Sequence, residues 1–124
     1  EGLAVAHLRT LSRLLGAGSL PLVEVVGLQG NGYGATAMRA LCDGLGPGTA
    51  PGLVKLWLYE NDIGPEGASA LATALDHGAL PNLKALHMHS NPLGDQGLVA
   101  LVPQLRRRPA LEELGIGGAG IGDD

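Results

Sequence analysis

The hydrophobic positions of this chain recur at intervals of about 30 residues. A reference unit has them at Leu53, Leu56, Leu58, Ile63, Leu71 and Leu75, with Asn61 between them. The same slots are filled further on by Leu83, Leu86, Met88, Asn91, Leu93, Leu101 and Leu105. They are filled earlier by Val23, Val26, Leu28, Asn31, Tyr33, Leu41 and Leu45, and near the end by Leu111, Leu114 and Ile116. This period predicts a solenoid, because stacked units share a core that no single unit can bury alone.

Each unit is expected to contain one strand and one helix. Residues 53–58 end in alternating apolar and polar side chains, which indicates a short parallel strand. Asn61 follows at the turn, where its amide can satisfy backbone groups that the turn leaves unpaired. Residues 64–78 then show the three-to-four spacing of an amphipathic helix, with Pro65 in its first turn and Gly78 at its end.

These slots resemble leucine-rich repeats, specifically the ribonuclease-inhibitor-like class, in the pattern L-x-x-L-x-L-x-x-N-x-I-G-x-x-G-A-x-x-L. The resemblance covers nearly the whole chain. It departs at Ala119, which stands in the asparagine slot, and at Ala37 and Met38, which replace the Gly-Ala pair. The resemblance implies an α/β fold, a right-handed β-α solenoid forming a horseshoe segment. Parallel strands would line its concave face and helices its convex face.

The chain is expected to form a single leucine-rich-repeat segment, 1–124. Whole repeats fall at about 21–50, 51–80 and 81–110, with partial repeats at 1–20 and 111–124. Solenoids need polar capping repeats, and neither partial repeat looks like one. We therefore expect a segment of a longer array, with a partner that covers the ends as the alternative. The chain begins at Glu1 rather than methionine, which leaves room for a removed leader.

Composition narrows the choice of partner and compartment. The formal net charge of −4 argues against nucleic acid and anionic membranes. No apolar run is long enough to span a membrane, and no secretory signal is visible. Cys42 is the only cysteine, which fits an intracellular place, cytoplasmic or organellar. It aligns with Ala72 and Val102 on a helix face, which predicts a position in or near the core rather than a nucleophile.

The outward strand positions carry the differences between repeats. Successive columns read Gly27, Trp57, His87, Gly115, then Gln29, Tyr59, His89, Gly117. The flanking columns read Val25, Lys55, Ala85, Glu113 and Gly30, Glu60, Ser90, Gly118. Adjacent strands lie about 4.8 Å apart, so Trp57 should neighbour His87, and Tyr59 should neighbour His89.

We predict a partner-binding patch on the concave face made of Lys55, Trp57, Tyr59, Glu60, His87, His89, Gln29 and Glu113. Tryptophan and tyrosine are enriched among the residues that dominate binding energy at interfaces. The alternative interpretation is that these outward side chains only pack on each other as cross-strand pairs.

Other features suggest sites that we discount. His87 and His89 point the same way, but a zinc site needs three or four ligands and only Glu60 or Tyr59 is near. The arginine run 106–108 ends a helix, where cations are favourable and are expected in solvent. The glycine-rich stretches lack the lysine and spacing of phosphate loops. We therefore expect no metal and no cofactor.

The resemblance implies a non-catalytic protein–protein interaction or scaffold module with a protein or peptide partner. A structural subunit of a larger complex is one alternative, and a GTPase activator similar to the Ran type is another. The second calls for an arginine in a loop that follows a strand, yet residues 29–34, 59–64, 89–94 and 117–122 contain no arginine or lysine. An inhibitor resembling ribonuclease inhibitor is disfavoured by the single cysteine. No carboxylate pair or nucleophile–base set is visible, so we expect no enzyme.

Overall fold

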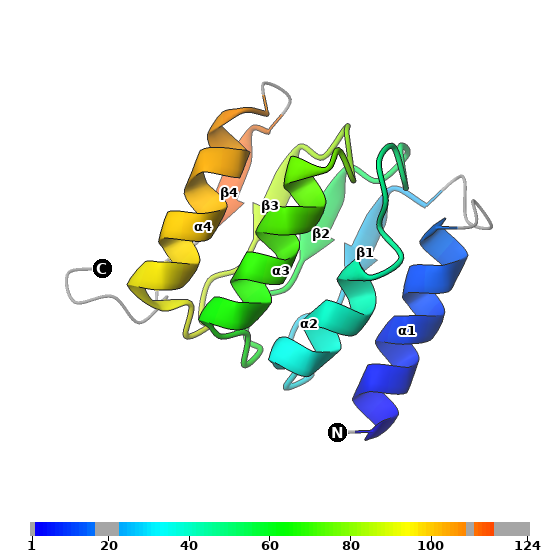
Figure 1. Ribbon diagram of the computed structural model, residues 1–124, viewed down its shortest axis with the longest axis vertical. Coiled ribbons are helices and arrows are strands. Elements are labelled where there is room, and N and C mark those ends of the chain that lie inside the picture. Colours follow the sequence, from blue (N-terminus) through cyan, green and yellow to red (C-terminus); the bar gives the residue numbers. More distant parts are fainter. Residues whose placement is uncertain (1, 17–22, 109–110, 116–124) are drawn as a thin grey trace.

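The computed structural model describes residues 2–16, 23–108 and 111–115. Helices and strands alternate along the chain: α1 (Gly2–Gly16), β1 (Val25–Gly27), α2 (Ala35–Cys42), β2 (Lys55–Trp57), α3 (Pro65–Asp76), β3 (Ala85–His87), α4 (Gly94–Arg106) and β4 (Glu113–Gly115). Figure 1 shows the helices side by side in one layer, in front of a sheet whose strands follow the same order. The strand-and-helix units predicted from the repeat are therefore present.

The sheet is parallel throughout, and its strands lie in the order β1-β2-β3-β4. The register places Gly27 beside Trp57, Trp57 beside His87 and His87 beside Gly115. Each strand is shorter than residues 53–58 suggested. Pairing nevertheless continues past β2, because the backbone N–H of Leu58 donates to the carbonyl of His87 at 2.7 Å.

The core lies between the sheet and the helix layer and continues from unit to unit. Its members fill the apolar slots of the repeat, among them Leu53, Leu56, Leu58, Ile63, Leu71, Leu83, Leu86, Met88, Leu93 and Leu101. Tyr33 is buried in the slot that holds isoleucine or leucine in the next two units. Ala37 and Met38 are also buried, so their departure from the repeat pattern does not expose the core.

The side chains of Asn61 and Asn91 join consecutive units at the turns after β2 and β3. The Asn61 side-chain oxygen accepts from the N–H of Tyr33 at 3.1 Å, and its amide nitrogen donates to the carbonyls of Leu28 and Leu58. Asn91 does the same one unit further on and has no exposed surface. The role expected of these asparagines is confirmed, since each satisfies backbone groups of its own unit and of the unit before it.

Small residues set the spacing between helices. A Cβ on Gly67 would lie 2.9 Å from the Cγ2 of Ile63 and 3.4 Å from the Cα of Ala35. Ala68 is fully buried next to it. Helix α3 begins at Pro65, as expected, and its end is followed by Gly78 with a φ of 92°. Such a left-handed residue after the helix favours glycine.

The prediction that the arginine run lies in solvent is wrong for Arg108, which is half-buried. Its guanidinium donates to the carbonyls of Leu75, Ala79 and Leu80, and burial lowers its pKa. The last carbonyls of a helix have no partner within the helix, so a cation from the following unit completes the end of α3. The other two arginines of the run remain exposed.

Candidate functional site

The eight residues predicted to bind a partner lie in the strands or in the turns that follow them. Along β2 the burial alternates, with Leu56 in the core and Lys55 and Trp57 facing away from it. We call the sheet face opposite the helix layer the open face; Figure 1 shows all four helices on the other side of the sheet. Strand β2 thus presents Lys55 and Trp57 on the open face, as the alternation required.

Four rings lie next to one another at the centre of the open face, and we call them the ring patch: Trp57, Tyr59, His87 and His89. Tyr59 and His89 are stacked, with ring centroids 4.6 Å apart and an angle of 9° between planes. Trp57 and His87 are tilted, with centroids 6.4 Å apart. The two neighbour pairs expected from the columns are therefore confirmed. All four side chains are half-buried, because the rings cover each other while their outer faces remain in solvent.

Glu113 joins the ring patch by a diagonal contact. Its backbone is in register with Ala85, but its carboxylate lies 3.2 Å from the Nε2 of His87. The Glu113 side chain is 65% exposed, against 31% for that of His87. The columns did not predict this pair, because glutamate is long enough to reach the next outward position on the neighbouring strand. It provides a carboxylate at one border of the ring patch.

Glycines on the outer strands leave space for side chains of the ring patch and for Gln29. A Cβ on Gly115 would lie 3.1 Å from the Nδ1 of His89, and one on Gly27 would lie 2.9 Å from the Oε1 of Gln29. That Gln29 oxygen is buried, and no hydrogen-bond partner for it exists among the described residues. Gly115 therefore leaves room for the His89 ring, and Gln29 holds an acceptor that is unpaired among the described residues.

Lys55 begins β2, Glu60 lies in the turn after that strand, and both residues are exposed. Lys55 is the first residue of the strand and is in register with Val25 and Ala85. Glu60 follows Tyr59 and donates its backbone N–H to the carbonyl of His89 at 3.1 Å. Its φ of 58° lies in the left-handed region that favours glycine, and Gly30 occupies the equivalent place one unit earlier.

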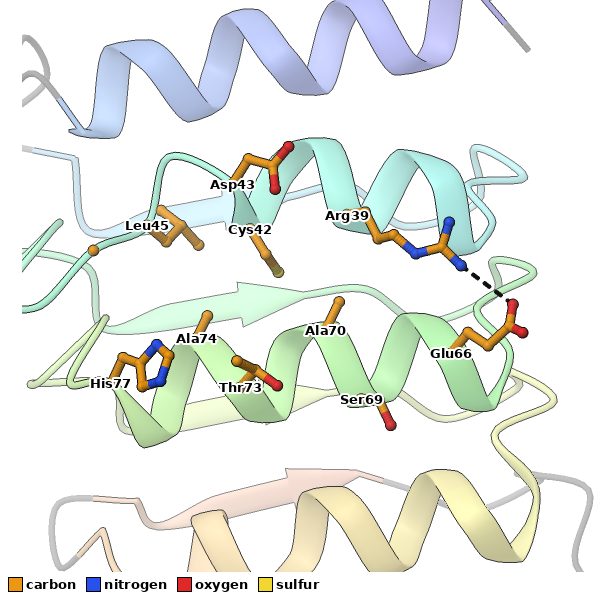
Figure 2. Close-up of a pocket in the computed structure, with 11 residues that line it drawn as sticks. Arg39, Cys42, Asp43, Leu45, Glu66, Ser69, Ala70, Thr73, Ala74 and His77 are labelled. Atoms are coloured by element: carbon orange, nitrogen blue, oxygen red, sulfur yellow. Dashed lines mark hydrogen bonds and ion pairs between the residues drawn. The ribbon is translucent and has the colours of Figure 1, made fainter.

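The sequence did not predict a groove of about 520 Å³ between α2 and α3, on the helix side of the molecule. Figure 2 shows Cys42 on α2 facing Ala70 and Ala74 on α3, with the ion pair of Arg39 and Glu66 at one end. Helix α2 has 8 residues and α3 has 12, so the shorter helix leaves part of the longer one uncovered. The signal for this early end was the glycine-rich stretch after Cys42.

Close packing fixes the end of α2. The N–H of Gly44 donates to the Oγ of Ser12 at 2.8 Å, and a Cβ on Gly44 would lie 2.8 Å from the Ser12 carbonyl oxygen. Cys42, two residues before Gly44, is half-buried, and desolvation of its thiol, followed by the Asp43 carboxylate, raises the pKa of the thiol to about 12. The thiol is neutral at physiological pH and is a poor nucleophile, in line with its predicted place near the core.

Metal-ligating side chains do not assemble within the described ranges. No group of three or more histidine, cysteine or acidic residues there is arranged to hold a metal ion. The His87–Glu113 pair supplies only two candidate ligands, fewer than a zinc site requires. Among the helices of the described residues, none is long and apolar enough to cross a membrane.

Comparisons with known proteins bear on the family. The sequence model of the Leucine Rich repeat family matches residues 52–72 and 79–102, which contain β2 and β3 and much of the helices after them. These residues of the chain are leucine-rich repeats. Its fold is the α/β solenoid implied by the sequence pattern. Proteins built from such repeats present extended surfaces for binding other proteins.

One solved structure with a similar fold is described as leiomodin-1 actin-binding site 2 (ABS2). It matches this leucine-rich-repeat chain with a TM-score of 0.66 and 15% sequence identity, over 90% of this chain and 58% of that chain. At this identity the likeness concerns the fold alone, and this chain spans little more than half of the other's length. A comparison with curated protein sequences found no match.

Proposed function

We propose that this chain is a non-catalytic protein-interaction module that binds a protein or peptide segment on the open face of its sheet. The single observation that supports this most is the ring patch. It places the only tryptophan of the chain beside a tyrosine and two histidines, all partly in solvent. Aromatic side chains held by their neighbours on a rigid sheet are suited to anchor a partner, because little conformational freedom is lost on binding.

The open face also has the chemical variety that a binding surface needs. Around the rings lie one ammonium group at Lys55 and carboxylates at Glu60 and Glu113. The scaffold slots, by contrast, are nearly the same in each unit. Side chains that differ between repeats lie on the outward positions, where they do not affect the shared core. This division supports a role in which the variable outward side chains determine binding specificity and the constant core positions maintain the fold.

The proposal is tested by comparing a substitution on the open face with one on the helix side. The protein would be immobilised as wild type, as Trp57→Ala and as Val99→Ala, and proteins retained from a cell extract would be compared. Val99 is 74% exposed on α4, so the substitution Val99→Ala removes an exposed apolar side chain on the helix side. We expect a partner to be retained by the wild type and by Val99→Ala and to be lost from Trp57→Ala. Retention by Trp57→Ala, with folding checked by circular dichroism, would disprove binding through the ring patch.

A further inference from the structure

We infer that the ring patch binds a basic segment, and that an arginine of the partner lies against the rings between Glu60 and Glu113. This inference rests on the proposed function, and it assigns the chemistry of the partner. Guanidinium groups are planar and weakly hydrated, so they stack on aromatic faces and pair with carboxylates at the same time. The open face offers both kinds of contact side by side.

The rings supply the flat surface. The rings of Tyr59 and His89 are stacked, and the ring centroids of His87 and His89 are 6.1 Å apart. Trp57 extends the same surface on β2. A cation over such faces is attracted by the electron density of the rings, and the attraction is strongest for tryptophan. An extended segment places alternate side chains on one face, as the strands below it do.

The carboxylates supply the charge. Glu113 gives one oxygen to His87, and the second oxygen remains available, since a carboxylate accepts at both. Glu60 stands at the other border with its carboxylate exposed. Among the eight predicted residues Lys55 carries the opposing charge, and it begins β2, whereas Glu60 follows the end of that strand. The balance at the rings is therefore negative, in the same sense as the net charge of −4.

One further observation points the same way. Beside the rings, the unpaired oxygen of Gln29 lies buried over Gly27. An acceptor without a donor is costly, and a guanidinium brings five donors. A side-chain rotation of Gln29 toward the bound arginine would pair this oxygen.

Trp57 fluorescence provides the test, because this is the only tryptophan in the chain. The probes are capped Gly-Arg-Gly-Arg-Gly-Arg-Gly and two matched peptides with citrulline or glutamate in place of arginine, titrated at pH 7.5 and low salt. Citrulline keeps the shape of arginine without its charge. We expect saturable quenching by the arginine peptide, at least tenfold weaker binding of the citrulline peptide, and weakening by added salt.

Charge variants of the protein then locate the contact. Glu60→Gln and Glu113→Gln should each weaken binding of the arginine peptide at least threefold. Glu66→Gln is the matched control, since Glu66 is an exposed glutamate on the helix side, 3.3 Å from Arg39. Its binding should equal that of the wild type.

Several results would overturn the inference. These are equal binding of the citrulline peptide, tighter binding of the glutamate peptide, no saturation by the arginine peptide, or equal effects of all three glutamate variants. The proposed function would still hold after any of these results if, in the capture experiment, Trp57→Ala fails to retain a partner that the wild type retains. The proposed function itself would be disproved if Trp57→Ala retained every partner of the wild type.

Discussion

The imidazole of His89 is stacked on the phenol ring of Tyr59, with centroids 4.6 Å apart and planes within 9°. The two residues occupy the same outward position in consecutive units, so the contact follows from the parallel register. Stacking holds both rings in place before any partner arrives. It also raises the question of how much of the ring patch serves stability rather than binding.

A double-mutant cycle answers that question. We expect Tyr59→Leu and His89→Ala to show a coupling energy of about 0.5–1.5 kcal/mol in chemical denaturation, the usual worth of a stacked pair beyond its buried area. The pair Tyr59→Leu and Val99→Ala is the control and should be additive, because Val99 lies on α4. A coupling of zero for the stacked pair would mean that the two rings are in contact without stabilising each other.

The stability of Trp57→Ala, compared with that of Leu71→Ala, shows whether Trp57 is a surface residue or part of the core. Trp57 is half-buried against His87, so its removal should lower the free energy of unfolding by less than about 1 kcal/mol. Leu71 has no exposed surface, and its truncation should cost about 2–5 kcal/mol through the cavity it leaves. If urea denaturation gave similar losses for both variants, Trp57 would be part of the core and the alternative interpretation, cross-strand packing alone, would hold.

Much of the fold and of the ring patch follows from the 30-residue period. A constant period fixes which residues share a row of the sheet, so Trp57 and His87 could be placed side by side from the sequence. The diagonal contact of Glu113 with His87 could not, because it depends on how far one side chain extends. The period also says nothing about helix length, and the early end of α2 at Cys42 depends on packing against Ser12.

Arg108 shows how a change in spacing hides a role. The N–H of Leu111 bonds to the carbonyl of Arg108 just as that of Leu83 bonds to Leu80, so Arg108 takes the place of Leu80 in the next unit. An alignment by 30 residues misses this, because the step to the last strand is shorter by two. The arginine run therefore looked like a solvated helix end, although Arg108 caps the end of α3, one unit earlier.

Removal of this cap should be measurable. Arg108→Met leaves the carbonyls of Leu75, Ala79 and Leu80 without the guanidinium donors and should cost about 1–3 kcal/mol of unfolding free energy. Arg106→Met, an exposed neighbour, should change it by less than about 0.5 kcal/mol. Urea denaturation of both variants decides the matter. Equal effects would show that the charge of the run matters and the hydrogen bonds of Arg108 do not.

The asparagine positions are expected to differ in importance according to burial. Asn91→Ala leaves the N–H of Ile63 and the carbonyls of Leu58 and Met88 without their partners inside the core and should cost at least about 3 kcal/mol. Asn31→Ala is the matched control. Asn31 is exposed and its side-chain amide reaches only carbonyls of its own turn, so we expect a loss below about 1 kcal/mol. Thermal denaturation of the two variants should rank them in that order, and the reverse order would contradict the structure.

The thiol of Cys42 should be unreactive in the folded protein. Burial raises its pKa to about 12 from an ordinary value of 9.0, so the folded chain holds roughly a thousandfold less thiolate at pH 8. We expect a disulfide reagent to react at least a hundredfold faster after unfolding, and the single cysteine makes the readout unambiguous.

The same shift predicts a pH dependence of stability. Because the folded-state pKa lies above the unfolded value, the neutral thiol contributes stability that is present in full below pH 9 and is lost as the pH rises through about 12. The free energy of unfolding of the wild type should therefore fall more steeply above pH 9 than that of Cys42→Ala, in which this group is absent. Parallel curves for the two proteins, or rapid modification of the folded chain, would place the thiol in solvent.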